Sequence, residues 1–241
     1  MATNINGDTG IDKIQPGTVE ASDIPDATIT AAKLDTTYLT PTGDGSGLTG
    51  IAGGFSNMAV FTSTGTWTNP GSVTKVKVTV IGGGGAGGTK PAPTNDHSGG
   101  GGGGGGAIEV LTIPTSPVAV TVGAAGGTSS FSTYCSATGG AAGAAGAGGV
   151  GGPGGAGGAG SGGTINASGG NGGFALGTNA GNGLGGDSAF GMGVGGASVS
   201  TQLVGDPGKG YGAGGSGSTG PATPAPRVGG SGAAGIVIVE Y

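Results

Sequence analysis

Glycine recurs at every third position from Gly140 to Gly158, and this spacing constrains the fold more than any other feature of the chain. An extended left-handed helix with three residues per turn, the polyproline II or polyglycine II conformation, places residues i and i+3 on one edge. Between Gly148 and Gly160 the repeat tightens to Gly-Gly-X, so such a helix would have two bare edges and one edge with side chains. Bare edges let neighbouring backbones touch and hydrogen-bond to each other. The X positions are Val150, Pro153, Ala156 and Ala159.

The composition explains why such helices would have to associate. Glycine makes up 68 of the 241 residues, while charged residues are 8% and aromatic residues 4%, so few side chains can fill a conventional core. Ordering each residue costs about 1–2 kcal/mol of backbone entropy, and glycine costs more than most. One hydrogen bond between helices returns only about 1 kcal/mol. We therefore expect a mainly β and irregular fold with almost no α-helix, in which packed polyglycine II helices are anchored by a small β base.

A dinucleotide-binding fingerprint is the main alternative explanation for the glycine. Gly82, Gly84 and Gly87 match G-x-G-x-x-G and follow a plausible strand. The fingerprint also requires a helix whose N-terminal amides hold the pyrophosphate. The chain instead continues with Pro91, Pro93 and eight consecutive glycines, which oppose a helix. We therefore expect no cofactor here.

Strand candidates outside the glycine tracts predict the β base. The segment 75–81 alternates valine with lysine or threonine at a period of two. The runs at 107–113 and 118–122 are joined by Pro-Thr-Ser-Pro, which predicts a hairpin. The apolar run at 235–241 predicts a central strand that is buried on both faces. The predicted tip domain spans 53–241, with the β base from 55–81, 107–122 and 235–241 and glycine tracts at 82–106 and 139–234.

Residues 1–52 differ from the rest of the chain in charge and in spacing. They hold seven acidic groups and two lysines and so carry the whole net charge of −5. Their apolar residues recur about every five positions, a spacing that fits neither a helix nor a strand. A single chain cannot bury so sparse a line, whereas three copies around an axis can. We therefore expect an extended trimeric shaft or attachment segment at 1–52, and hence a homotrimer.

Several classes of function lack the residues that they require. Neither part of the chain is basic, so a nucleic acid has no electrostatic partner. Cys135 and His97 are each the only residue of their type, too few for a structural zinc site, although a trimer could gather three copies of His97 around one ion. Cys135 alone is expected to be a small buried residue. The chain has no evident signal peptide or membrane span, which indicates synthesis in a cytosol.

Inserts with larger side chains interrupt the glycine tracts, and we expect them to be turns between helices that run out and back. They lie at 89–98, 164–168, 197–204 and 218–228. Polar and charged groups of these inserts are candidates for receptor contact, because the remaining surface is nearly bare. These candidates are Lys90, Asn95, Asp96, His97, Thr201, Gln202, Thr223 and Arg227.

Three aromatic residues lie inside the glycine-rich part of the chain. They are Phe174, Phe190 and Tyr211. We predict that they fill gaps between the helices. An exposed Tyr211 could instead contact a sugar ring.

Four segments of the chain resemble parts of phage tail-fibre proteins. The segment FTSTGTWTNPGSVTKVKVTVIGGGGAGG (61–88), with GAAGIVIVEY at 232–241, resembles the glycine-rich domain that often ends such fibres. DGSGLTGI (44–51) and VEASDIPDATITAAKL (19–34) resemble shaft and attachment segments. The tip domain is also similar to the adhesins of T-even-type phages, in which packed polyglycine helices display receptor-binding loops.

The resemblance implies a virion protein of the tail fibre that attaches to a bacterial surface glycan or outer-membrane protein. Residues 1–52 would join other tail or baseplate proteins. The alternative is a purely structural fibre or baseplate component. An ice-binding bundle shares the period of three but needs a flat, regular face. We do not expect an enzyme, because the adjacent Asp96 and His97 cannot readily orient each other and the acids Asp187 and Asp206 stand singly.

Overall fold

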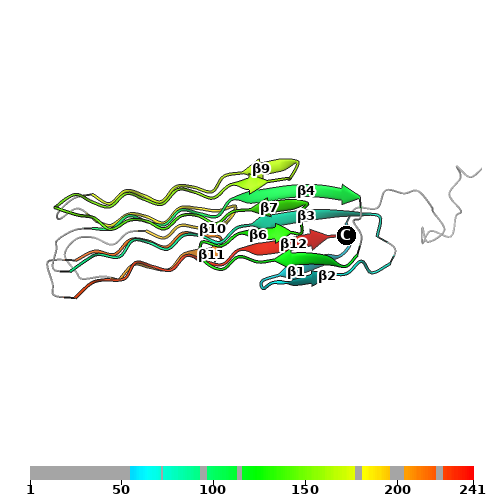
Figure 1. The fold of residues 1–241 in the computed structure, drawn as a ribbon, viewed down its shortest axis with the longest axis horizontal. Coiled ribbons are helices and arrows are strands. Elements are labelled where there is room, and N and C mark those ends of the chain that lie inside the picture. Colours follow the sequence, from blue (N-terminus) through cyan, green and yellow to red (C-terminus); the bar gives the residue numbers. More distant parts are fainter. Residues whose placement is uncertain are drawn as a thin grey trace, which may run out of the picture. The chain divides into compact units, whose positions relative to one another are not determined.

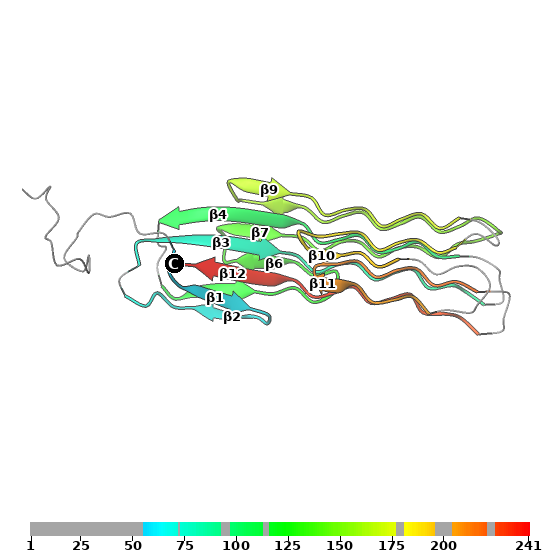
Figure 2. The ribbon, with the colours of Figure 1, turned by 180° about the vertical axis from the view of Figure 1, so that it is seen from behind.

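The chain divides into two units, Met1–Ala52 and Gly53–Tyr241, and all the residues described by our computed structural model belong to the second. The predicted trimeric segment at 1–52 therefore lies outside the described residues. Figures 1 and 2 show most strands of the second unit gathered at one end, with the glycine tracts extending from them to the other. The described residues are 55–71, 73–92, 97–112, 116–176, 181–195, 204–220 and 225–241.

The described residues form twelve β-strands and contain no α-helix, which confirms the predicted mainly β class. Each paired strand lies antiparallel to its neighbours. The strands are β1 (Met58–Phe61), β2 (Gly65–Trp67), β3 (Lys75–Ile81), β4 (Gly106–Thr112), β5 (Val118–Thr121), β6 (Ser129–Phe131), β7 (Cys135–Ala137), β8 (Gly160–Ser161), β9 (Ile165–Ala167), β10 (Phe190–Met192), β11 (Lys209–Tyr211) and β12 (Ile236–Glu240).

Two five-stranded sheets form a sandwich, which is the β base of the glycine tracts. One has the order β1-β12-β3-β4-β9 and the other β2-β5-β6-β7-β8. Their facing side chains make the apolar core, and the Trp67 ring lies 5.9 Å from that of Tyr241 and 6.2 Å from that of Phe131, centre to centre. The fully packed residues of this core are Trp67, Val76, Val78, Val80, Ala107, Val118, Val120, Phe131, Cys135, Ala137, Val237 and Val239.

The predicted hairpin between 107–113 and 118–122 is wrong, because β4 and β5 belong to different sheets. β4 pairs with β3 and β9, whereas β5 pairs with β2 and β6. Alternating apolar residues specify a strand but not its partner, so the short connection between these runs gave the wrong pairing. The terminal strand β12 is central as predicted, since it lies between β1 and β3 with Val237 and Val239 fully buried.

Cys135 is buried in the sandwich, as predicted for a lone small residue. Burial raises the pKa of its thiol to about 11, with a smaller contribution from the negative charge of Glu109. The thiolate is the nucleophilic form of cysteine. The native protein therefore holds this group protonated and unreactive at neutral pH.

We expect iodoacetamide at pH 8 to leave Cys135 unmodified in the native protein and to label it fully in denaturant, because native Cys135 is both inaccessible and protonated. The pKa of Cys135 is higher in the folded protein than in the unfolded chain. Its contribution to the stability of the folded state is therefore complete below the unfolded pKa and is lost as the pH rises toward 11. Intact mass after timed labelling measures both states. Complete labelling of the native protein at pH 8 would contradict this environment.

The glycine tracts continue the strands without a change of register. The last residue of β3, Ile81, pairs with the first residue of β4, Gly106. The next amides of the first tract then bond to the carbonyl oxygens that the same register predicts. These bonds are Gly82 to Gly105, Gly85 to Gly102 and Gly88 to Gly99, at 3.0, 2.7 and 2.8 Å. Where valine gives way to glycine, the bonds to one neighbour therefore recur every third residue, as in polyglycine II.

The tract Gly99–Gly105 is the centre of the bundle. All its amides donate to neighbouring tracts, and successive residues address three different neighbours in turn. Its carbonyl oxygens accept from three further tracts, through the amides of Gly82, Gly85 and Gly88, of Gly155 and Gly158, and of Gly186. The central helix thus has six neighbours, and the predicted packing of polyglycine II helices is observed. The donor-to-acceptor pairs are Gly99 to Ala144, Gly100 to Gly173, Gly101 to Gly215, Gly102 to Ala141, Gly103 to Gly170, Gly104 to Gly212 and Gly105 to Thr138.

A tract with more neighbouring tracts has more edges that carry only glycine. Gly99–Gly106 is buried throughout, and a Cβ on any residue from 100 to 104 would lie less than 3.0 Å from a backbone carbonyl oxygen of another tract. The outer tract at 151–159 buries every third glycine and exposes Pro153, Ala156 and Ala159. The octaglycine run therefore occupies the interior, and the Gly-Gly-X repeat occupies the periphery.

A turn at 147–150 divides the apparently continuous repeat of 140–158 into an outgoing and a returning tract. Ala147 and Val150 bond to each other, and Gly148 and Gly149 have φ values of 61° and 82°. Glycine accepts this left-handed backbone readily. The sequence did not reveal the turn, because the period of three passes through it unchanged. The insert at 164–168 is not simply a turn either, since β9 pairs with β4.

We expect Gly102→Ala to destabilise the protein by about 1–3 kcal/mol, because its Cβ would meet the Ala156 carbonyl oxygen in a closely packed interior. The unfolding midpoint should fall by several degrees, at roughly 2–4 °C per kcal/mol for a unit of this size. Differential scanning calorimetry measures the change. The matched control is Gly195→Ala, whose Cβ would meet only the Leu184 side chain at 4.0 Å. Equal midpoints for the two variants would contradict the packing.

Candidate functional site

Two inserts meet at the end of the tracts away from the sheets. Lys90 and Arg227 form an antiparallel bridge, with the Lys90 amide 2.9 Å from the Arg227 carbonyl oxygen. This bridge continues the β3–β12 register through the pairs Gly84–Ala233 and Gly87–Gly230. The described parts of the inserts 89–98 and 218–228, far apart in sequence, are therefore held together at one end of the bundle, which lies opposite the sheets in Figure 2.

Ser218 ties these inserts together. Its hydroxyl accepts a hydrogen bond from the Lys90 amide at 2.8 Å and donates to the Arg227 carbonyl oxygen at 2.7 Å. Its own amide donates to Gly88, and its carbonyl oxygen accepts from the Ser98 amide. Ser218 is fully buried, so water does not compete for these bonds. We call Lys90, Ser218 and Arg227 the end clamp.

The next residue along the chain binds the histidine. His97 Nδ1 lies 2.5 Å from Thr219 Oγ1, and both side chains are buried. The His97 carbonyl oxygen accepts from the Gly152 amide at 2.9 Å, which connects this insert to the tract that follows the turn at 147–150. The histidine is thus part of the packing at this end of the bundle.

The prediction that Lys90 and His97 present their side chains at the surface is wrong. Lys90 is 0% exposed and His97 is 3% exposed. Lys90 turns back to donate from Nζ to the Pro91 carbonyl oxygen at 3.2 Å, which satisfies part of the ammonium within its own insert. Arg227 is half-buried. The candidates that lie outside the described residues are Asn95, Asp96, Thr201, Gln202 and Thr223.

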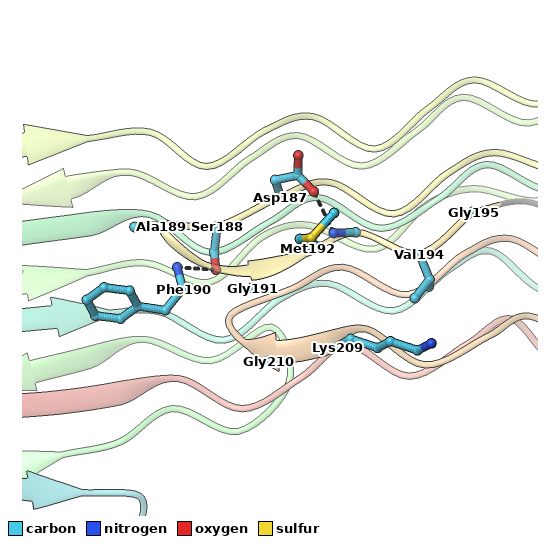
Figure 3. Close-up of a pocket in the computed structure, with 11 residues that line it drawn as sticks. Asp187, Ser188, Ala189, Phe190, Gly191, Met192, Val194, Gly195, Lys209 and Gly210 are labelled. Carbon is cyan, nitrogen blue, oxygen red and sulfur yellow. Dashed lines mark hydrogen bonds between the residues drawn. The ribbon is translucent and has the colours of Figure 1, made fainter.

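The prediction that the aromatic residues fill gaps is also wrong, because Phe174, Phe190 and Tyr211 are 54%, 47% and 39% exposed. Gaps do not arise where bare backbones touch. Phe190 and Tyr211 instead face each other across the two-stranded sheet β10–β11, which the sequence did not reveal because each strand is short and contains glycine. Beside it lies an open depression of about 660 Å³, shown in Figure 3.

The glycines of the apparent dinucleotide fingerprint take part in packing. The amides of Gly82, Gly84 and Gly87 donate to three carbonyl oxygens of neighbouring tracts, at 3.0, 2.8 and 2.8 Å. In the described part of the chain no helix follows them whose N-terminus could hold a phosphate. The same described residues include no group of three side chains that could hold a metal ion. They also include no helix that is long and apolar enough to cross a membrane.

Comparison with known proteins adds no family. No protein-family model matches the chain, and no curated protein does. The functional argument therefore depends on this chain's own residues.

We expect Ser218→Ala to loosen the end clamp without unfolding the sandwich. Loss of the hydroxyl removes bonds at Lys90 and Arg227 that are each worth about 0.5–1.5 kcal/mol. Amide exchange at 88–90 and 227 should accelerate about 3- to 10-fold, as followed by hydrogen–deuterium exchange mass spectrometry. The control is Ser161→Ala, at an exposed serine of β8. Unchanged exchange in Ser218→Ala would show that the clamp does not hold the inserts.

Proposed function

We propose that this chain is a phage tail-fibre adhesin. In this proposal, segments at the end of the glycine bundle attach the virion to a bacterial surface receptor, which is a glycan or an outer-membrane protein. The sandwich and the tracts act as a stiff support. Residues 1–52 form the trimeric attachment to other tail or baseplate proteins. The protein acts by binding and not as an enzyme.

The observation that carries the proposal is the convergence of distant inserts at one end of a rigid bundle. Lys90 and Arg227 are separated by most of the tip domain in sequence, yet Ser218 binds the backbone of both. Binding residues often lie on loops that a rigid scaffold positions. The tract walls carry mainly glycine and alanine, which leaves the inserts as the main source of polar contacts. A homotrimer would multiply weak individual contacts into firm attachment.

A structural role without receptor contact is the second candidate function. The burial of Lys90 and His97 favours it, since two of the eight proposed contact residues serve internal packing. The remaining receptor candidates are Arg227 and those outside the described residues. The two functions differ in what the inserts must do, so exchange of the inserts separates them.

We expect the purified chain to compete with virions for adsorption to host cells. A variant with Asn95, Asp96 and Thr223 changed to alanine should compete at least 10-fold less well, because the proposed contacts are lost while the clamp is kept. Residual free virus, counted after timed mixing with host cells, measures the competition. Thr164→Ala, at the sheet end of the molecule, serves as the control.

The structural alternative predicts a different result. If the wild-type chain fails to compete at saturating concentration, and virions that carry the triple variant adsorb normally, the adhesin function is rejected. If the triple variant competes as well as wild type, attachment uses other residues.

A further inference from the structure

The β10–β11 sheet concentrates large side chains on a wall that is otherwise almost bare. Its cross-strand pairs are Phe190 with Tyr211 and Met192 with Lys209. Phe190, Met192 and Tyr211 are 47%, 74% and 39% exposed, and Lys209 is exposed as well. Exposed apolar groups that gather in a patch indicate a binding surface more often than isolated ones do. This patch shares no residue with the end clamp.

The depression beside this sheet combines apolar and charged groups. Its lining includes Asp187, Phe190, Met192 and Lys209. In Figure 3, Phe190 extends toward the sheets and Lys209 extends away from them, so the ring and the ammonium lie at opposite ends of the depression. In the described part of the chain the one ion pair joins Lys77 to Glu240, so neither Asp187 nor Lys209 is neutralised by an ion pair there.

Local hydrogen bonds hold this surface in shape. Asp187 Oδ1 accepts from the Gly193 amide at 2.6 Å, which orients the carboxylate and leaves Oδ2 for other partners. The Ser188 hydroxyl donates to the Tyr211 carbonyl oxygen and accepts from the Phe190 amide at 3.3 Å. The two aromatic residues are therefore attached to one serine through their backbones. A preformed surface loses little entropy when a ligand binds.

We infer that this depression binds a saccharide, with the apolar face of a pyranose ring against Phe190. The C–H groups of a pyranose carry partial positive charge and are attracted to the negative face of an aromatic ring. The Lys209 ammonium donates to ring or hydroxyl oxygens, and the Asp187 carboxylate accepts from hydroxyl groups. The inference extends the proposed function, because it names a glycan as a receptor component and adds a second contact on the side of the bundle.

The charges of the depression favour a neutral saccharide over other occupants. Asp187 repels a polyanion, and Lys209 repels a cationic peptide. A purely apolar segment would bury both charges without partners, at considerable cost. A neutral saccharide can place the apolar face of one ring against Phe190 while its hydroxyl groups hydrogen-bond to the charged side chains. A shallow open site of this kind should bind one sugar unit weakly, with a dissociation constant of order 1 mM.

Saturation-transfer NMR on the full chain tests the inference, with the methyl glycosides of glucose, galactose, mannose and N-acetylglucosamine as probes. We expect at least one to receive saturation, and we expect Phe190→Ala to weaken its binding at least 5-fold. Lys209→Ala should weaken binding as well. The controls are Phe174→Ala, at a similarly exposed ring outside the depression, and Lys75→Ala, at an exposed lysine of β3.

The inference is overturned if none of the glycosides binds, or if binding survives Phe190→Ala. It is also overturned if Phe190→Ala lowers the oligomer mass in native mass spectrometry, because the surface would then join copies of this chain. Adsorption competition separates this result from failure of the proposed function. A chain that competes for host cells but binds no glycoside retains the adhesin function without this site. A chain that binds a glycoside but does not compete retains the site and loses the adhesin function.

Discussion

Hydrogen bonds between the backbones of adjacent glycine tracts are the interaction on which this structure depends. The amides of Gly99–Gly105 bond to three neighbouring tracts in rotation, and its carbonyl oxygens accept from three more. Each bond contributes only about 1 kcal/mol net, and ordering glycine is costly, so one tract alone has no reason to stay ordered. Bonding in six directions changes this balance, because each ordered residue supports several neighbours. The bundle thus replaces the side-chain core that the composition cannot supply.

The sandwich sets the phase of the bundle. A β-strand hydrogen-bonds to two neighbours within one plane, whereas a helix with three residues per turn can hydrogen-bond to neighbours on every side. The β3–β4 and β12–β3 pairings continue beyond Ile81 with unchanged register, so the valine core determines which amide meets which carbonyl oxygen far from the sheets. The same register reaches Lys90 and Arg227. A slip in the sandwich would therefore misalign the end clamp.

The sequence predicted the parts of this structure that arise from local periodicity. Alternating valines predicted β3, the apolar terminus predicted β12 as a central strand, and the period of three predicted the tracts. It could not supply pairings that depend on the whole fold, such as the separation of β4 from β5. The turn at Gly148 was invisible for a related reason, because glycine serves both in the turn and in the tract. The sequence did not predict the burial of Lys90 and His97. A charged or polar residue in an insert is usually exposed to solvent, and only its neighbours in the fold show that it is buried.

Polar chemistry is confined to places where the packing of tracts is incomplete. Inside the bundle a side chain collides with a neighbouring carbonyl oxygen, as it would at Gly102. Side chains larger than serine are therefore restricted to the sandwich, the outer edges, the ends of tracts and the short β10–β11 sheet. Near that sheet the backbone leaves the regular spiral, since Gly210 and Gly212 have φ values of 80° and 76°. The same constraint that makes the walls bare thus leaves larger side chains at few positions, which include the end of the bundle and the depression beside Phe190.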